Sequence, residues 1–388
     1  MRYDAIIIGG GAAGLAAAVA LSRRGRRVAV LEAQPRVGRK LLSTGNGRCN
    51  FTNTGAAPED YFGDAALARG ALAAFPPARV LEFFASLGVP ARVDAEGRAY
   101  PSSNAASSVL DALRLSLQEA GGEEVVGFRV RALSRDLVAT AEDGRQMAGR
   151  CALLATGGLA APSLGAADAP FVKTLGLRFT RRAPALAPLE TESVPALKGL
   201  RAQCVLSLEG HMERGEILFT EYGVSGIAAM QLSRFARPGA TLSIDFLGGA
   251  QPALAARAQM LPKRRMEDFL NGIVPRRVGQ VLTKSAGIPL SKTAGELDTA
   301  EISALETVLT GWTLPVHGVR GYAQAQVTAG GLEGTQFDPD TLEARRVPGL
   351  YAAGEMLDVD GPCGGYNLQW AWASALLAAR SMDERLKA

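Results

Sequence analysis

Residues 1–22 read MRYDAIIIGGGAAGLAAAVALS, and two interpretations fit this stretch. An arginine followed by a long run of apolar and small residues is typical of a secretory signal peptide. The same letters are also typical of a buried strand, a glycine turn and a helix that together bind a phosphate. A signal peptide should end at a cleavage site, whereas this run leads into SRRGRRVAVLEA, which has the pattern of another strand. We therefore favour the strand–turn–helix interpretation.

The glycines of this stretch have the spacing of a dinucleotide-binding turn. Gly9, Gly11 and Gly14 fit G-x-G-x-x-G, and Glu32 follows about 20 residues later. Gly9 allows a tight turn, Gly11 lets a pyrophosphate approach the backbone, and Gly14 lets the helix lie close to the strand. Glu32 can accept hydrogen bonds from both ribose hydroxyls of an adenosine. This pattern predicts a bound dinucleotide but does not separate NAD from FAD. The strand, helix and second strand are expected at residues 3–8, 12–22 and 27–31.

Residues 38–53, GRKLLSTGNGRCNFTN, form the first of three later segments that favour FAD. The segment follows the acidic residue directly, where an NAD-binding domain would continue its sheet. It is rich in glycine, asparagine and hydroxyl groups, and it also carries Arg39, Lys40 and Arg48. Such a loop can surround a second phosphate and line a flat ring with backbone donors. The alternative is a polar surface loop.

Two further segments have the pattern of strands that end beside a ligand. Residues 151–165, CALLATGGLAAPSLG, predict a strand that returns to the first sheet and ends in small residues, although a plain turn is the alternative. Near the C-terminus, a strand at 350–353 is followed by Glu355 and by a glycine-rich turn at 361–365. A helix then begins, and its positive end would face an electron-rich ring edge. Glu355 could hydrogen-bond ribityl hydroxyls; the alternative is an ordinary amphipathic helix after an acidic loop.

These motifs together resemble a known group of flavoproteins. The N-terminal GxGxxG with its Glu, the ATGG strand and the C-terminal GLYAAGE look like the glutathione-reductase-type FAD superfamily, nearest to its fumarate-reductase-like branch. Within it, GRKLLSTGNGRCNFTN, GEILFTEYGVSG, QVTAGGL and GEMLDVDGPCGGYNLQWAWAS resemble a bacterial FAD-binding flavoprotein family. Its members are described as aminoacetone-oxidase-like or as 3-dehydro-bile-acid (Δ4,6) reductase-like. Many members carry FTH-x-G-x-SGP, whereas this chain has FTEYGVSGI at 219–227, without the His and Pro.

The fingerprint and the resemblance predict a site for non-covalent FAD, with NAD(P)H as a transient electron donor. The resemblance also places the backbone near Val130 beside the adenine. The expected cofactor-binding residues are Gly9, Gly11, Ala12, Ala13, Gly14, Glu32, Ala33, Gln34, Arg39, Lys40, Gly45, Asn46, Arg48, Cys49, Asn50, Val130, Ala155, Thr156, Gly157, Gly354, Glu355, Gly365, Tyr366, Asn367 and Leu368.

The expected fold class is α/β: a Rossmann-like FAD-binding domain with a three-layer parallel sheet, an inserted antiparallel β-barrel-like domain and a helical subdomain. Short alternating runs such as CVLSLEGHM predict the barrel, and helical spacing after it predicts the helices. We assign 1–183 and 328–388 to the FAD domain, 184–250 and 313–327 to the barrel, and 251–312 to the helical part. Other expected elements are helices at 77–87 and 107–120, a hairpin at 89–100, two strands within 125–141 closed by 142–144, and a return to the barrel at 318–327.

Composition narrows the function classes. The net charge of +4 is too small for this length to indicate nucleic-acid binding. The four cysteines lie far apart and only two histidines occur, which excludes a zinc cluster or disulfide scaffold and favours a reducing cytoplasm. No later apolar stretch is long enough for a membrane helix, so we expect no membrane contact. The basic side chains at 263–265, 276–277 and 284 could contact an acidic substrate or RNA, or could be solvated helix surfaces.

The expected chemistry is that of the flavin, and the catalytic residues are not identified. A single GxGxxG argues against a built-in nicotinamide domain, and Cys49 and Cys363 lack the spacing of a redox pair. Tyr366, Glu221 and Tyr222 are candidates for proton transfer, or else packing and turn residues. We expect an FAD-dependent oxidoreductase that reduces an activated C=C of a small compound between flavin domain and barrel. The alternatives are an amine-type oxidase using oxygen and an RNA-binding or tRNA-modifying flavoprotein.

Overall fold

The computed structural model describes residues 2–250 and 252–388, and it divides the chain into two compact units. The first unit comprises the residues up to Pro184 and those from Gln326 to the C-terminus; the second is Ala185–Ala325. Each unit has its own hydrophobic core. The chain leaves the first unit at β11 (Ala183–Ala185) and re-enters it at β18 (Val327–Ala329), and these two strands pair.

The first unit is built on a sheet of order β7-β2-β1-β10-β9-β8, with β19 also paired to β10. The strands β7, β2, β1, β10 and β19 are parallel, whereas β9 and β8 add an antiparallel meander. The last four residues of the central β1, Ala5 to Ile8, are all apolar and buried, which is typical of a parallel strand covered on both faces. The strands are β1 Arg2–Ile8, β2 Val28–Leu31, β7 Glu123–Val125, β8 Val130–Leu133, β9 Val138–Ala141, β10 Gln146–Leu154 and β19 Leu350–Ala352.

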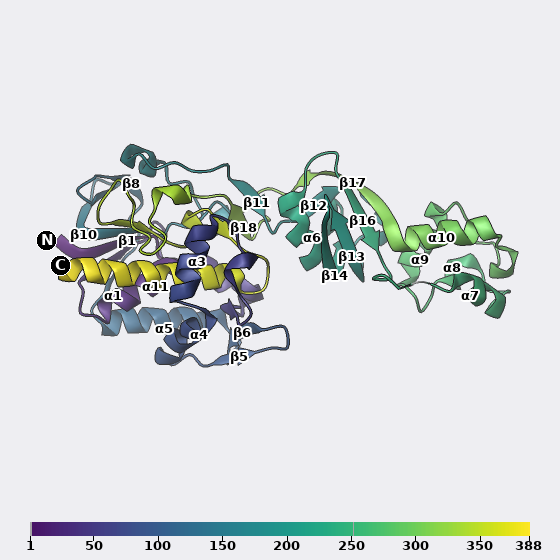
Figure 1. Cartoon of the computed structure of the whole chain (residues 1–388), viewed down its shortest axis with the longest axis horizontal. Helices are drawn as coiled ribbons and strands as arrows, with labels where there is room; N and C mark the ends of the chain where they lie inside the picture. The colour runs from purple at the N-terminus through teal and green to yellow at the C-terminus, as the bar shows by residue number, and fades with distance from the viewer. Residues whose placement is uncertain (1, 251) are drawn as a thin grey trace. The chain divides into compact units, whose positions relative to one another are not determined.

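Three helices pack beside this sheet, and α1 packs against both α5 and α11 (Figure 1). Alanine is the commonest residue of α1, which is buried on all sides and lies close to its neighbours. Shorter helices and strands, among them α3, α4, β3 and β20, contact α11. The helices are α1 Ala12–Ser22, α2 Arg39–Ser43, α3 Ala65–Ala74, α4 Pro77–Ser86, α5 Ala106–Glu119 and α11 Tyr366–Lys387; the short strands are β3 Thr52–Asn53, β4 Phe62–Gly63, β5 Ala91–Val93, β6 Arg98–Pro101 and β20 Val359–Asp360.

The register of the sheet brings four strand ends together. Ile8 at the end of β1 lies opposite Leu31 of β2 and Leu154 of β10, and Leu154 lies opposite Ala352 of β19. The loops that follow these strands start at Gly9, Glu32, Ala155 and Ala353. In open parallel sheets, ligands bind at this carboxyl edge. Four segments from distant parts of the sequence therefore meet where a dinucleotide is expected.

The second unit contains a closed antiparallel barrel of order β12-β15-β14-β13-β16-β17. Apolar side chains of β13 alternate with polar ones and fill the interior. A group of helices is inserted between β16 and β17. The elements are β12 Leu189–Thr191, β13 Arg201–Leu208, β14 His211–Phe219, β15 Gly223–Ser225, α6 Ile227–Leu232, β16 Thr241–Asp245, α7 Leu254–Met260, α8 Met266–Phe269, α9 Arg276–Ser285, α10 Thr299–Gly311 and β17 Trp312–Val319.

The expected fold class is confirmed, with two local corrections. The strand that returns to the barrel is β17, not 318–327, because β18 pairs with β11 outside the barrel. The turn at 142–144 does not close the strands within 125–141; it leads from β9 into β10, whose first residues pair back on β9. The inserted helices α7 to α10 belong to the same compact unit as the barrel. A separate helical subdomain at 251–312 stays a prediction.

Candidate cofactor site

In the turn between β1 and α1, backbone atoms lie so close to two of the glycines that a side chain would not fit. A Cβ on Gly14 would lie 1.9 Å from the carbonyl oxygen of Gly9, so no larger residue fits there. Gly9 has a φ of +111°, and a Cβ on it would lie 2.4 Å from the carbonyl oxygen of Ala155. At Gly11, the N-cap of α1, nothing lies within 4 Å of the Cβ position. The protein thus fills the space around Gly9 and Gly14 and leaves open the space at the helix N-terminus.

Glu32 holds the chain around this turn. One carboxylate oxygen accepts a hydrogen bond from the backbone N–H of Gly10 at 2.8 Å, and the other accepts from the N–H of Gln34 at 2.7 Å. The segment before β8 joins the same group, since the N–H of Phe128 donates to the carbonyl of Glu32 at 2.8 Å. Glu32 therefore organises the loop, and the chain near Val130 passes beside it.

Residues 38–53 are partly helical rather than a continuous loop, because α2 occupies Arg39–Ser43. Gly45, Asn46 and Cys49 then have φ values of +56°, +56° and +57°, which give the tight path of the segment. The Cys49 side chain is fully buried, and burial raises the pKa of its thiol to about 12. This suits a packing role better than a reactive one.

The arginine side chains of this segment contact other groups of the protein. Arg39 donates to Oε1 of Gln34 at 2.7 Å and to the carbonyl of Ser163 at 3.0 Å. The guanidinium of Arg48 lies 5.1 Å from the centre of the Tyr100 ring. Their expected contact with a phosphate stays a prediction.

Lys40 and Glu355 link two of the expected segments. The Lys40 ammonium lies 2.6 Å from one carboxylate oxygen of Glu355, and the backbone N–H of Thr328 donates to the other at 2.9 Å. A Cβ on Gly158 would lie 2.4 Å from that second oxygen, which explains why small residues follow Thr156. Three distant segments converge on this carboxylate.

The turn at 361–365 and the first turn of α11 form a second organised group. Asn367 accepts from the N–H of Gly361 at 2.9 Å and donates to its carbonyl at 2.7 Å, so its amide closes the glycine-rich turn. Gly365, the N-cap, has a φ of +103°. Tyr366 packs edge-on against Tyr61, and burial raises the pKa of Tyr366.

Several side chains that hold the site were not expected from the sequence. The indole of Trp370 donates to the carbonyl of Gly354 at 2.9 Å, and that of Trp372 donates to the carbonyl of Phe51 at 2.8 Å. Gln369 accepts from the Thr52 hydroxyl at 2.6 Å. The sequence does show polar groups within an otherwise apolar helix, and such groups need hydrogen-bond partners when they are buried. The partners, however, lie more than 300 residues away in sequence for Trp372 and Gln369.

Asn50 leaves one acceptor without a partner. Its Oδ1 is buried and receives no hydrogen bond in the described part of the chain. It lies next to the N-terminus of α11, since a Cβ on Gly365 would lie 2.8 Å from it. The N–H groups at the start of α11 and the open helix N-terminus at Gly11 are features that a bound dinucleotide with a polar ring would complete. The residues present therefore fit FAD.

Other candidates lie in the second unit. Glu221 and Tyr222 form the turn between β14 and β15, where Glu221 pairs with Lys198 at 2.8 Å and the Arg320 guanidinium lies 4.8 Å from the Tyr222 ring centre. The ring of His211 stacks on Phe235 with centroids 3.4 Å apart, and His317 lies in β17. A role of Glu221 or Tyr222 in proton transfer stays a prediction.

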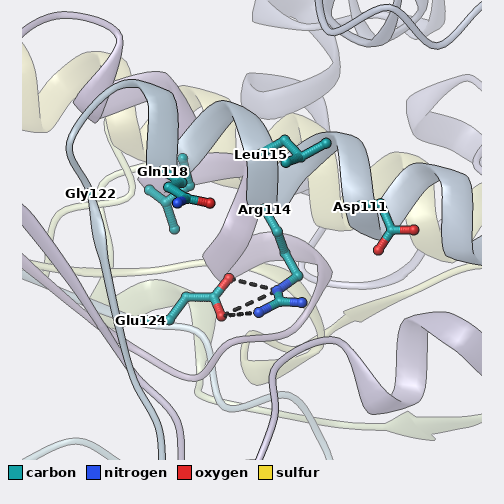
Figure 2. Close-up of a pocket in the computed structure, with 7 residues that line it drawn as sticks. Asp111, Arg114, Leu115, Gln118, Gly122 and Glu124 are labelled. Atoms are coloured by element: carbon teal, nitrogen blue, oxygen red, sulfur yellow. Dashed lines mark hydrogen bonds and ion pairs between the residues drawn. The ribbon is translucent and has the colours of Figure 1, made fainter.

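A surface pocket elsewhere in the first unit holds none of the expected residues. It lies between α5 and the start of β7, where Arg114 forms two hydrogen bonds of 2.9 Å to Glu124 (Figure 2). Within the described residues, no group of three or more His, Cys, Asp or Glu could hold a metal ion. A search of the same residues finds no helix with the length and apolarity that crossing a membrane requires.

Comparison with known proteins places the chain in a family. The HI0933-like protein Rossmann domain matches residues 3–381. The chain is 36% identical over 405 residues to the 3-dehydro-bile acid delta(4,6)-reductase of Clostridium scindens, with 98% of each chain covered. It is 32% identical over 398 residues to the ribosomal RNA dihydrouridine synthase of Escherichia coli, again with 98% covered on both sides.

A solved structure has the same fold. The 3-ketosteroid delta1-dehydrogenase of Sterolibacterium denitrificans aligns over 99% of this chain and 100% of its own, with a TM-score of 0.54 and 13% identity. The family resemblance drawn from the sequence motifs is confirmed by the family match and by the first of these relatives. The chain belongs to the HI0933-like family of Rossmann-type, FAD-dependent oxidoreductases.

Proposed function

We propose that the chain binds FAD non-covalently within its first unit and reduces a carbon–carbon double bond that is conjugated to a carbonyl group. Two full-length relatives support this proposal, because their names describe one kind of reaction on different molecules. A delta(4,6)-reductase and a dihydrouridine synthase both add two hydrogens across a double bond. In a 3-oxo-4,6-diene and in uracil alike, that bond is conjugated to a carbonyl.

The residues at the carboxyl edge of the sheet would hold the cofactor. The open N-terminus of α1 at Gly11 suits the pyrophosphate, and Glu32 suits the adenosine ribose. Lys40 and Thr328 fix the carboxylate of Glu355, which suits the ribityl chain. These residues would hold FAD so that the cofactor could supply a hydride for the β-carbon of the substrate, and NAD(P)H is the proposed source of the electrons.

The α-carbon needs a proton, and Tyr366 is the candidate donor in the first unit. Burial raises the pKa of this phenol, so it carries its proton at neutral pH. Replacing it with Phe keeps the ring that packs on Tyr61. We expect Tyr366→Phe to leave reduction by NAD(P)H unchanged and to slow the reaction of reduced protein with substrate by about 10²-fold or more.

The first substrate class to test is a small fused-ring ketone, which agrees with the 36% identical relative. Uracil in RNA is the second candidate, which agrees with the 32% identical relative. A local observation supports RNA: Lys263 and Arg264 are exposed, and no salt bridge of either side chain occurs within residues 2–250 and 252–388. Neighbouring Arg276 is instead paired with Asp268 at 2.7 Å.

One anaerobic experiment separates these possibilities. The purified protein is reduced with NADPH or NADH and then mixed with a 3-oxo-4,6-diene steroid, with bacterial ribosomal RNA lacking dihydrouridine, or with an amine. Return of the oxidised flavin spectrum with the steroid supports the first class, and return with RNA supports the second. Bleaching of the oxidised protein by the amine, with neither acceptor reacting, contradicts the proposal. A preparation that binds no flavin also contradicts it.

A further inference from the structure

The inserted helices carry the positive charge of the chain. Residues 252–292 contain eight Lys and Arg but two acidic residues, Glu267 and Asp268. The whole chain has 42 Lys and Arg against 38 Asp and Glu, so its other residues together carry a slight excess of acid. The modest net charge therefore averages over a strongly basic segment, which comprises α7, α8 and α9.

Three of these eight cations hold the fold together. Arg257 and Arg277 donate to backbone carbonyls at 2.8 Å and 2.7 Å, and Lys292 pairs with Glu301 of α10 at 2.6 Å. A fourth cation, Lys284, lies in the last turn of α9. The other four lie just before α8 and at the start of α9, and these two helices pack against each other (Figure 1). We call these four residues the basic edge: Lys263, Arg264, Arg265 and Arg276.

Two carboxylates lie among the arginines of the basic edge. Arg276 donates to Asp268 at 2.7 Å and lies 3.8 Å from Glu267, and Arg265 lies 3.7 Å from Glu267. The pKa of Asp268 is lowered, first by its hydrogen bond from Arg276 and also by the charge of Arg264. The arginines outnumber the carboxylates between them, so the edge keeps a net positive charge.

Lys263 and Arg264 present their charges on a fixed backbone. Both residues are exposed, and neither side chain forms an ion pair within residues 2–250 and 252–388. The N–H of Ala294 donates to the carbonyl of Arg264 at 2.8 Å, and the N–H of Gly295 donates to that of Pro262 at 2.9 Å. The protein therefore holds these two residues in place without neutralising their side chains.

The exposure of the basic edge favours an extended polyanion over a small acidic molecule, which binds best in an enclosed pocket. The side chains of Arg265 and Arg276 are 64% and 57% exposed. Phe269 is the one aromatic residue of 252–311 and is fully buried, so this segment offers no ring on which unpaired bases could stack. A folded RNA helix presents rows of phosphates and is bound through its backbone without such stacking.

We propose that the basic edge binds the phosphate groups of a folded RNA helix. The inference deepens the second substrate class of the proposed function, uracil in RNA, and its link to that reaction rests on the proposed function. It assigns the inserted helices the role of a docking surface for RNA. Lys263 and Arg264 supply the charges that RNA neutralises, whereas Arg265 and Arg276 extend the same positive surface.

Fluorescence anisotropy with a labelled hairpin of bacterial ribosomal RNA tests this surface over a range of salt concentrations. We expect the double variant Lys263→Ala/Arg264→Ala to bind the hairpin about fivefold or more weakly than the native protein. The slope of log affinity against log salt concentration should decrease in magnitude by roughly 1.5, because two phosphate contacts are lost. An unpaired strand of the same length should bind the native protein more weakly than the hairpin.

Arg69→Ala/Arg346→Ala is the matched control. Both arginines are exposed residues of the first unit, and neither side chain forms an ion pair in the described part of the chain. The control removes the same charge as the test variant and should keep the native affinity and salt slope. Both double variants should keep the native melting temperature, since neither removes an ion pair within the protein.

The outcomes separate this inference from the proposed function. Equal weakening in both double variants, native affinity in Lys263→Ala/Arg264→Ala, or equal binding of hairpin and unpaired strand would each overturn the docking surface. Binding of phosphatidylglycerol vesicles but not of the hairpin would overturn it as well. If the hairpin does not bind but the steroid reoxidises the flavin, the inference fails and the proposed function stands. If the hairpin binds at the basic edge but no acceptor reoxidises the flavin, the proposed function fails and the docking surface stands.

Discussion

Individual residues at the β1–α1 turn have separable roles. Gly14 is required by the fold, because a Cβ there would meet the carbonyl oxygen of Gly9 at 1.9 Å. Gly11 is not required by the fold, because its Cβ position is open within 4 Å and its φ of −83° suits any residue. Packing within the protein thus explains Gly14, whereas the expected ligand explains Gly11.

Two substitutions test this difference. Gly14→Ala should destabilise the protein by ~2 kcal/mol or more, because the backbone of Gly9 must move. Gly11→Ala should fold with a melting temperature near that of the native protein and bind FAD at least tenfold more weakly, because its methyl group occupies the space of the pyrophosphate. Thermal unfolding without FAD and titration with FAD measure the two effects. Equal affinity in Gly11→Ala would argue against a phosphate at this turn.

Glu213 in β14 gives a pH-dependent prediction. Burial raises its pKa in the folded protein, although Gln231 donates to its carboxylate at 2.8 Å. The folded state therefore binds this proton more tightly than the unfolded state, and the associated stability is lost as pH rises through the raised pKa. Glu213→Gln should raise the melting temperature at about pH 8 and change it little at about pH 4.

Glu221→Gln is the control for that measurement. Lys198 lowers the pKa of Glu221, so the sign is opposite, and the variant should gain nothing at high pH. An equal gain for both variants, or none for Glu213→Gln, would show that burial of Glu213 does not disfavour its charge.

At the scale of elements, α11 does more than cover the sheet. Its indole groups bind the backbone carbonyls of Gly354 and Phe51, and Gln369 accepts from the Thr52 hydroxyl, so one helix fixes two segments of the candidate cofactor site. The ion pair of Lys40 with Glu355 joins α2 to the turn after β19 in the same way. The site therefore depends on contacts between elements that are distant in sequence.

Trp372→Phe tests the contribution of α11. The change keeps an aromatic ring against Phe84 and removes the donor to the buried carbonyl of Phe51. We expect a loss of about 1–3 kcal/mol in stability and weaker FAD binding, because the 38–53 segment loses an anchor. Leu115→Ala on the exposed surface of α5 is the control, and it should change neither the stability nor the affinity for FAD. Unaltered FAD affinity in Trp372→Phe would mean that the anchor does not shape the site.

At the scale of the whole molecule, all expected cofactor-binding residues belong to the first unit. The second unit has its own barrel and its own core. A ligand that binds one folded unit stabilises that unit by mass action. The two units should therefore respond differently to FAD.

Hydrogen exchange on the full chain with and without FAD measures this response. We expect slower exchange in the segments around Gly9–Gly14, residues 38–53 and the start of α11. We expect little change in the barrel strands β13 and β16, which contain no expected cofactor residue. Uniform protection across both units would contradict a site confined to the first.

The sequence by itself determined the nucleotide-binding elements, because short-range patterns encode them. The helix at 12–22, the second strand and the start of α11 follow from runs of apolar or small residues and from glycine spacing in neighbouring residues. Barrel strands such as β13 likewise follow from a largely alternating pattern of apolar and polar residues. The family could also be predicted from the sequence, because its motifs are short runs of consecutive residues.

Only the tertiary structure decided which of these polar groups have a hydrogen-bond partner within the protein and which do not. Glu32, Arg39 and Asn367 bind the protein's own backbone or side chains, whereas Asn50 keeps a buried oxygen free in the described chain. The sequence placed all four on one list of cofactor contacts. Hydrogen-bond partners depend on contacts between segments hundreds of residues apart, and no local pattern records them. The same physical reason explains why the return strand was misplaced at 318–327: pairing in a closed barrel is set by its neighbours, not by the strand alone.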